Sequence, residues 1–162
     1  GYKRLIRISS AAACDGFYYQ PRTDLNKVSS FWNDKDLQLC IPFYDSFLFK
    51  NTTTFSVCLP DFKFTKPVFF LEDNDLPFDY LVREKARNYC KENKFNTLPV
   101  KSIYYEDKKD FKAYLTFKCI NKRTTLENPK FDHLCSDEFS FESWQEQEKI
   151  GKTKKKSAKE VS

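Results

Sequence analysis

Six widely spaced cysteines constrain the fold of this chain more than any other feature of its 162 residues. They are separated by 26, 18, 32, 29 and 16 residues and lie at Cys14, Cys40, Cys58, Cys90, Cys119 and Cys135. None belongs to the Cys-x-x-Cys pair that zinc ribbons and thiol redox sites use to direct two thiolates at one point. His133 and Cys135 are close in sequence, but a second such pair is missing. We therefore expect no metal site and no cofactor.

An even number of distant cysteines is typical of disulfides formed in an oxidising compartment. We expect up to three disulfides, and six cysteines allow fifteen pairings between which the sequence does not choose. The alternative is six buried thiols in an intracellular protein. Asn51-Thr52-Thr53 is a glycosylation sequon on an expected exposed turn, and this agrees with secretion. The sequence predicts a secreted, extracellular protein.

Aromatic residues are abundant, with 17 Phe, 9 Tyr and 2 Trp, and such residues favour strands. The clearest alternation covers 111–119, where Phe111, Leu115 and Phe117 share one parity with Cys119. Further strands are expected within the ranges 2–8, 12–19, 37–43, 47–49, 54–59, 62–70 and 100–105. No apolar run approaches the roughly 18–20 residues of a membrane span.

One helix is predicted over 78–94, because Leu81, Val82, Ala86 and Cys90 recur at helical spacing opposite charged residues. Weaker helical patterns cover 23–32 and 142–149. The expected fold is a mainly β, disulfide-stapled single domain with one packed helix. It is either a β-barrel-like fold or an α+β fold.

The net charge of +5 is concentrated at the C-terminus. Residues 149–162 hold six lysines and one acid, whereas residues 1–148 hold 22 basic and 22 acidic side chains. We therefore expect a β-rich domain over 1–148 and a basic, disordered tail over 149–162. A neutral body lacks the basic bias of a nucleic-acid-binding domain, so nucleic acid is a less favoured partner.

Glycine is too scarce for phosphate-binding loops. Gly1, Gly16 and Gly151 are far apart, whereas a Walker loop or a dinucleotide fingerprint needs several glycines within a few residues. His133 is the single imidazole, so a small hydrolase would depend on it, and a ribonuclease pair would add Glu138 or Glu142. No spacing singles out these residues, and we expect no enzymatic activity.

Binding agrees better with the aromatic content. Phe17, Tyr18 and Tyr19 are consecutive, so on a strand they would not all face inward. Together with Trp32 they are the candidate partner-binding residues, because exposed aromatic rings dominate protein interfaces and also stack on bases.

Two local patterns carry a resemblance to a class of proteins. Ala13-Cys14-Asp15-Gly16 followed by the pattern over 23–32 resembles the opening of ribonuclease-like mildew effectors. A second match runs from Phe55-Ser56-Val57-Cys58 through the helix at 78–94 to Cys119. The two matches cannot both correspond to the same element of those effectors. Size, cysteines and aromatic residues are similar to those of small secreted effectors and toxins of plant-pathogenic fungi.

This resemblance implies a secreted, non-enzymatic effector or toxin that binds a host protein or receptor and provokes or suppresses host defence. The alternatives are a ribonuclease-like fold that binds RNA without catalysis and a secreted immunomodulator of an animal parasite. We expect a monomer without a membrane span.

Overall fold

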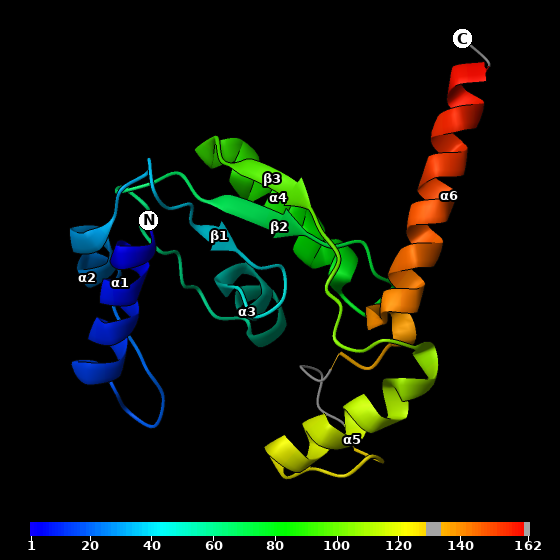
Figure 1. The fold of residues 1–162 in the computed structure, drawn as a ribbon, viewed down its shortest axis with the longest axis horizontal. Helices are drawn as coiled ribbons and strands as arrows, with labels where there is room; N and C mark the ends of the chain where they lie inside the picture. The colour runs from blue at the N-terminus through cyan, green and yellow to red at the C-terminus, as the bar shows by residue number, and fades with distance from the viewer. Residues whose placement is uncertain (129–133, 161–162) are drawn as a thin grey trace. The chain divides into compact units, whose positions relative to one another are not determined.

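The computed structural model describes residues 1–128 and 134–160, with side chains as far as residue 150, and it is dominated by helices (Figure 1). Three short strands form one sheet in the order β1-β2-β3, and β1 pairs in parallel with β2. The elements are α1 (Tyr2–Cys14), α2 (Leu25–Phe31), β1 (Cys40–Ile41), α3 (Phe47–Thr54), β2 (Val68–Leu71), α4 (Asp79–Asn93), β3 (Asn96–Pro99), η1 (Lys108–Asp110), α5 (Phe111–Lys122), η3 (Asp137–Phe139) and α6 (Phe141–Glu160).

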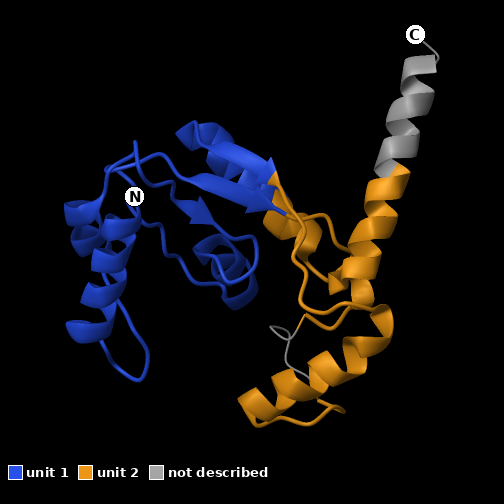
Figure 2. Cartoon of the chain, viewed as in Figure 1, with its two compact units in different colours: residues 1–71, 84–98 blue, residues 72–83, 99–162 orange. Residues whose placement is uncertain are grey.

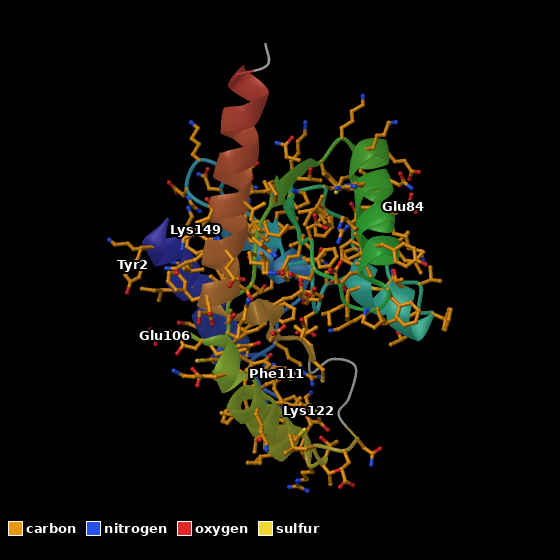
Figure 3. The ribbon with its side chains drawn as sticks, turned by 90° about the vertical axis from the view of Figure 1, so that its right-hand side faces the viewer. Tyr2, Glu84, Glu106, Phe111, Lys122 and Lys149 are labelled. Carbon is orange, nitrogen blue, oxygen red and sulfur yellow. The ribbon has the colours of Figure 1, made fainter. Side chains whose placement is uncertain are left out.

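The predicted mainly β fold, with its β-barrel-like alternative, is therefore wrong. The best predicted strand, over 111–119, lies in α5, whose ends Phe111 and Lys122 are labelled in Figure 3. The partly buried and buried positions of α5 include Phe111, Leu115 and Cys119, which have helical spacing as well as a common parity. The helix is favoured by a capping box between Asp107 and Asp110 before it and by a left-handed Arg123 after it.

Two of the other predicted strands are confirmed in part, since β1 lies within 37–43 and β2 overlaps 62–70, and two more fall in helices. Residues 2–8 belong to α1, and residues 47–49 begin α3, where the hydroxyl of Ser46 accepts a hydrogen bond from the Phe49 amide at 3.1 Å. The helix predicted over 78–94 is confirmed as α4, and the weaker pattern over 23–32 contains α2. Helix α6 contains the pattern over 142–149 and continues to Glu160, through residues for which the sequence predicts disorder.

Two compact units divide the chain (Figure 2). Unit 1 comprises residues 1–71 and 84–98, and unit 2 comprises residues 72–83 and 99–162. The boundaries between the units fall after residues 71, 83 and 98, and the division predicted at residue 148 stays a prediction. In the described part of the chain, no helix combines the length and the apolar character needed to cross a membrane.

Phe69 is the centre of the core of unit 1. Its ring is 2% exposed and stacks on Phe95 at 5.8 Å, with Tyr89 at 5.7 Å and Phe47 at 6.1 Å between ring centroids. The remaining members of the cluster come from β1, α3, the segment before β2, β2 and α4: Ile41, Leu48, Phe62, Leu71, Ala86 and Cys90. Aromatic packing thus joins the short sheet to two helices.

Phe139 has the corresponding place in unit 2, where it is fully buried. Tyr104 packs on it at 5.5 Å and stacks on Tyr114 at 5.6 Å, and Tyr105 contacts Tyr114 at 5.1 Å. The amide of Tyr104 donates to the carbonyl of Phe139 at 2.9 Å, and Tyr105 forms a parallel bridge with Ser140. Rings and backbone therefore join the segment before α5 to the start of α6.

The disulfides predicted from the sequence are also wrong, because all six cysteines are free. Cys90 and Cys119 are buried, and Cys14, Cys40, Cys58 and Cys135 are exposed. The two buried thiols act as small apolar side chains, and burial raises the pKa of Cys90 to about 11. The secreted effector or toxin role was predicted largely from disulfides, so it loses that support.

Thiol reactivity tests this assignment. With Ellman's reagent at mildly alkaline pH, we expect the four exposed cysteines to react in the native protein. Cys90 and Cys119 should react only on unfolding, because the reagent does not reach buried thiols. Six reactive groups should be counted in unfolded protein that has not been reduced. A count below six under those conditions would contradict the free thiols.

The aromatic core gives a second prediction. Phe69→Ala should lower the free energy of unfolding by about 3–5 kcal/mol, since it removes a buried ring and leaves a cavity. Phe55→Ala is the matched control, because that ring is 92% exposed, and its effect should stay within about 0.5 kcal/mol. Urea unfolding followed by circular dichroism measures both; similar losses in the two variants would refute the assignment of the core.

Candidate functional site

Three consecutive aromatic residues form the most exposed loop among the sequence-predicted candidates. Phe17, Tyr18 and Tyr19 follow α1 and are 63, 64 and 87% exposed. We call residues 16–22 the aromatic loop. The sequence predicts that at least one of the three rings faces solvent, and the structure exposes all three.

The base of the aromatic loop is closed by hydrogen bonds to the last turns of α1. The amide of Gly16 donates to the Ala11 carbonyl at 3.2 Å, and the amide of Arg22 donates to the Ala12 carbonyl at 3.3 Å. A Cβ atom at Gly16 would lie 1.9 Å from the carbonyl oxygen of Arg22. Position 16 therefore requires glycine, because any side chain would separate the two ends of the loop.

The tip of the loop is also held in one conformation. The amide of Tyr18 donates to the carbonyl of Gln20 at 3.2 Å, and Tyr19 between them has a φ of 60°. A left-handed backbone is unfavourable for a non-glycine residue, so it persists only where neighbouring contacts enforce it. The Tyr18 and Tyr19 rings meet edge to face at 4.8 Å, and the Arg22 guanidinium lies 5.6 Å from the centroid of the Tyr18 ring. The rings are thus presented by an ordered turn.

Trp32, the fourth candidate, is not part of this exposed group. It caps the C-terminus of α2, and its indole nitrogen donates to the Asp34 carboxylate at 2.7 Å. Its ring packs edge to face on Phe64 at 5.5 Å. Hydrogen bonds from Thr65 and Trp32 lower the pKa of the Asp34 carboxyl. These contacts assign Trp32 a structural role.

Asn51, the glycosylation candidate, lies inside α3 and not on the expected turn. Its amide nitrogen donates to the Cys58 carbonyl at 2.8 Å, and its amide oxygen accepts from the Cys58 amide at 3.1 Å. The Asn51 side chain thus forms a pair of hydrogen bonds with the backbone of the segment that follows α3. A glycan on the Asn51 nitrogen would have to be accommodated beside the Cys58 carbonyl that this nitrogen contacts.

Dividing the chain into units reveals a charge asymmetry that the even balance over 1–148 conceals. Unit 1 has 13 Lys and Arg and 8 Asp and Glu, a net charge of +5. Within unit 2, residues 72–83 and 99–150 have 10 basic and 14 acidic side chains, a net charge of −4, and residues 151–162 bring the whole unit to zero. The aromatic loop therefore lies on a basic unit, which the sequence alone did not delimit.

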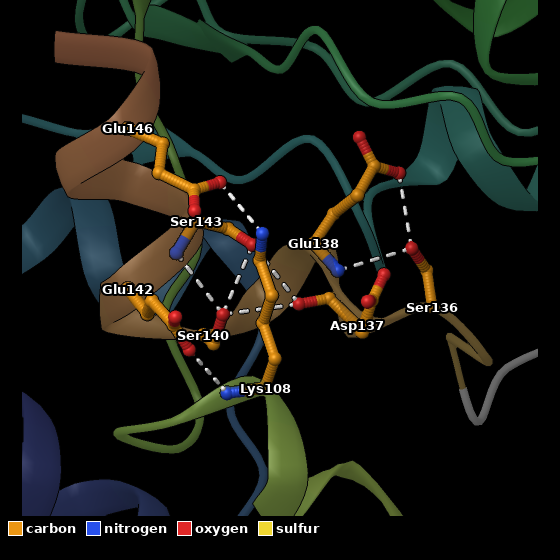
Figure 4. A network of polar contacts seen from close by, with 8 residues as sticks. All are labelled: Lys108, Ser136, Asp137, Glu138, Ser140, Glu142, Ser143 and Glu146. Carbon is orange, nitrogen blue, oxygen red and sulfur yellow. Dashed lines mark hydrogen bonds and ion pairs between the residues drawn. The ribbon is translucent and has the colours of Figure 1, made fainter. Parts of the chain in front are cut away.

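The carboxylates proposed for a ribonuclease pair are engaged in local structure in unit 2 (Figure 4). Glu138 accepts hydrogen bonds from the Ser136 hydroxyl at 3.0 Å and from the Asp75 amide at 3.1 Å. Glu142 accepts from the Lys108 amide at 3.0 Å, and the Lys108 ammonium pairs with Glu146 at 2.6 Å. His133, the third member of that hypothesis, lies outside the described residues.

Ser140 and Ser143 belong to the same network and stabilise the start of α6. The Ser140 hydroxyl accepts from the Ser143 amide at 3.1 Å and lies 3.0 Å from the Ser143 hydroxyl (Figure 4). Both residues are buried. This arrangement is a helix cap, so these serines are not suited to act as nucleophiles.

A buried polar cluster that the sequence did not indicate joins residues 72–74 to residues 101–102. The Glu72 carboxylate accepts a hydrogen bond from the side-chain amide of Asn74 at 2.9 Å. It also accepts from the backbone amide of Ser102 at 3.2 Å and from the Ser102 hydroxyl. The Lys101 ammonium donates to Asn74, and burial lowers the pKa of Lys101 against the opposing effect of nearby carboxylates, Glu138 first. Three donors satisfy both oxygens of the buried Glu72 carboxylate, so we assign the cluster a structural role.

Within the described residues, no group of three or more His, Cys, Asp or Glu is arranged to hold a metal ion. The structure therefore brings together Phe17, Tyr18 and Tyr19 as an exposed group, and it assigns structural contacts to Trp32, Asn51, Glu138 and Glu142. No model of a known protein family matches this chain, and no curated protein is significantly similar to it. The resemblance to fungal effectors stays a prediction.

Tyr105 provides a test of unit 2. Its hydroxyl donates to the Ser136 carbonyl at 2.8 Å, and burial, followed by the nearby Asp137 charge, raises its pKa to about 12. Because the unfolded pKa is near 10, the folded state favours the neutral phenol; this stabilisation is complete below pH 10 and is lost as the pH rises toward about 12.

Tyr105→Phe should therefore lower the free energy of unfolding at neutral pH by about 1 kcal/mol. The difference from the parent protein should shrink as the pH rises above 10. Urea unfolding at a series of pH values measures it, with the exposed Tyr80 replaced by Phe as the control. A difference that stayed constant across the alkaline range would contradict the raised pKa.

Proposed function

We propose that this protein is a non-enzymatic binding module whose aromatic loop contacts an acidic surface of a partner protein. The observation that carries the proposal is the ordered presentation of Phe17, Tyr18 and Tyr19 to solvent. Covering large rings that are exposed to water lowers the free energy of a complex. A loop that is already ordered also loses little conformational entropy on binding.

The chemistry of the partner follows from the charge of unit 1. A net charge of +5 attracts acidic surfaces and repels basic ones, and Arg22 adds a cation beside the Tyr18 ring. Tyrosine and arginine are enriched among the residues that dominate binding energy. Apolar residues flanked by Asp or Glu are therefore the expected complement of the loop.

Single-stranded nucleic acid is a second candidate, favoured by the same two features. Bases stack on exposed rings, and a basic unit neutralises phosphates. The two candidates differ in their dependence on salt, because phosphate binding releases counterions and weakens steeply as salt rises.

Selection of phage-displayed random peptides on the full-length protein tests the proposal. We expect enrichment of acidic peptides with apolar residues. Tyr18→Ala and Tyr19→Ala should each weaken binding of a synthetic copy of such a peptide by about ten- to a hundredfold, measured by fluorescence polarisation. Phe55→Ala is the matched control, since it removes an equally exposed ring of unit 1, and it should bind like the parent protein.

Gly16→Ala separates the conformation of the loop from its side chains. It removes no aromatic side chain, but it forces the Arg22 carbonyl away from position 16 and so changes the conformation of the loop. Peptide affinity should therefore fall by about tenfold or more while the fold is retained. Peptides that bind all variants equally, or no enrichment at all, would refute the proposal. Tight binding of a labelled oligouridine that weakens steeply with salt would instead assign the loop to nucleic acid.

A further inference from the structure

A second surface of unit 1, on α1, has no role in the proposed protein contact. The side of α1 that faces α2 includes the partly buried residues Arg4, Ile8, Ala11 and Ala12. At about 100° per residue, the exposed residues Tyr2, Leu5, Ile6, Ser9 and Ala13 share another sector of the helix, about 100° wide. We call these five residues the outer face of α1.

The outer face is apolar except for the Ser9 hydroxyl and the Tyr2 phenol, contains no charged residue and is open to solvent. Tyr2, Leu5 and Ile6 are 77, 56 and 46% exposed, and no residue of α1 is fully buried. The side chain of Tyr2, labelled in Figure 3, is directed away from the helix ribbon. Large apolar side chains exposed together on one helix face indicate a surface that another body covers.

The charges beside the outer face indicate which kind of surface binds to it. Residues 1–14 include Lys3, Arg4 and Arg7 and no acid. Arg4 donates to Asp36 at 3.1 Å, whereas neither Lys3 nor Arg7 forms an ion pair within the described part of the chain. Two cations beside an apolar face complement an anionic surface. A second copy of the chain would place the same cations against each other.

We propose that the outer face of α1 binds the surface of an anionic phospholipid bilayer. Leu5 and Ile6 enter the boundary between headgroups and acyl chains, Tyr2 lies at that boundary, and Lys3 and Arg7 contact the phosphates. The helix lies in the plane of the membrane and does not cross it.

The size of the face favours a bilayer over a folded partner. A helix of 13 residues is about 20 Å long, and a strip about 10 Å wide along it covers roughly 200 Å². A stable protein interface needs about 800 Å² on each partner. A bilayer imposes no such minimum area. On its continuous surface, the binding free energy from inserting a few apolar side chains adds to that from attracting cations.

A shallow groove beside the outer face adds an apolar contact for lipid. It has a volume of about 300 Å³ between α1 and α2, with Ile6 and Phe31 among its apolar residues and Arg7 and Lys27 among its cations. Lys27 is already paired with Asp15 at 3.5 Å, so Arg7 is the cation of the groove that remains for a headgroup. An acyl chain in the groove would have its phosphate near Arg7.

Sedimentation with vesicles tests the proposal on the full-length protein. We expect binding to vesicles of phosphatidylcholine mixed with phosphatidylserine, and weak or no binding to phosphatidylcholine alone. Leu5→Gln with Ile6→Gln should reduce partitioning by about tenfold or more. Val57→Gln with Leu59→Gln removes another exposed apolar pair of unit 1 and should have little effect.

A charge-matched pair separates α1 from the lysine-rich C-terminus. Lys3→Gln with Arg7→Gln should weaken binding about 25-fold, at roughly fivefold for each cation. Lys155→Gln with Lys156→Gln removes the same net charge and should weaken it much less. Circular dichroism melts check that each variant remains folded.

Four outcomes would overturn the proposal. They are no binding to either vesicle, equal binding to both vesicles, equal losses in the two charge variants, and retained binding in the Leu5 and Ile6 variant. A concentration-dependent dimer in sedimentation velocity without lipid, abolished in the same variant, would assign the face to a second copy instead. The aromatic loop is unchanged in all these variants, so the result is independent of the peptide selection.

Discussion

Burial of aromatic rings is the interaction on which both units depend. The sheet offers little backbone pairing of its own, since β1 has two residues and β2 and β3 have four each. Phe69 in β2 is therefore stabilised less by its ladder than by the rings of Phe47, Tyr89 and Phe95 around it. In unit 2, Tyr104 before α5 packs on Phe139 and also stacks on Tyr114 within α5. The positions of the helices follow from which rings they contribute.

Helix α4 and the existence of α2 were predictable, because their apolar residues recur at helical steps and Asp24 supplies a cap for α2. The strand predicted over 111–119 was wrong because Phe111, Leu115 and Cys119 satisfy both periods. The caps at Asp107, Asp110 and Arg123 decide between them, and they lie outside the window in which alternation was judged. Aromatic content was taken as a strand signal, whereas in this protein the rings pack mainly between helices and short strands.

The exposed aromatic loop was predictable in part for a simple geometric reason: three consecutive large rings do not all fit one side of an extended chain. The role of Gly16 was not, because a lone glycine carries no pattern and its necessity arises from the Arg22 carbonyl six residues later. Trp32 was predicted to be exposed as an aromatic residue of a loop or an outward strand position. In the structure its indole donates to the nearby Asp34 and packs on the distant Phe64, and only the second contact depends on tertiary structure. The cysteines misled most, since an even number of cysteines is a property of the sequence, whereas disulfides require proximity in space.

The interleaved segments of the two units have a consequence for biosynthesis. Residues 84–98 contribute Ala86, Cys90 and Phe95 around Phe69, so the nascent N-terminal unit stays incomplete until the ribosome has released residue 98. By then residues 72–83, which belong to the other unit, have already been translated. Fragments that end at residue 71 would leave a half-built aromatic centre facing water, and aggregation is the expected fate of such a fragment.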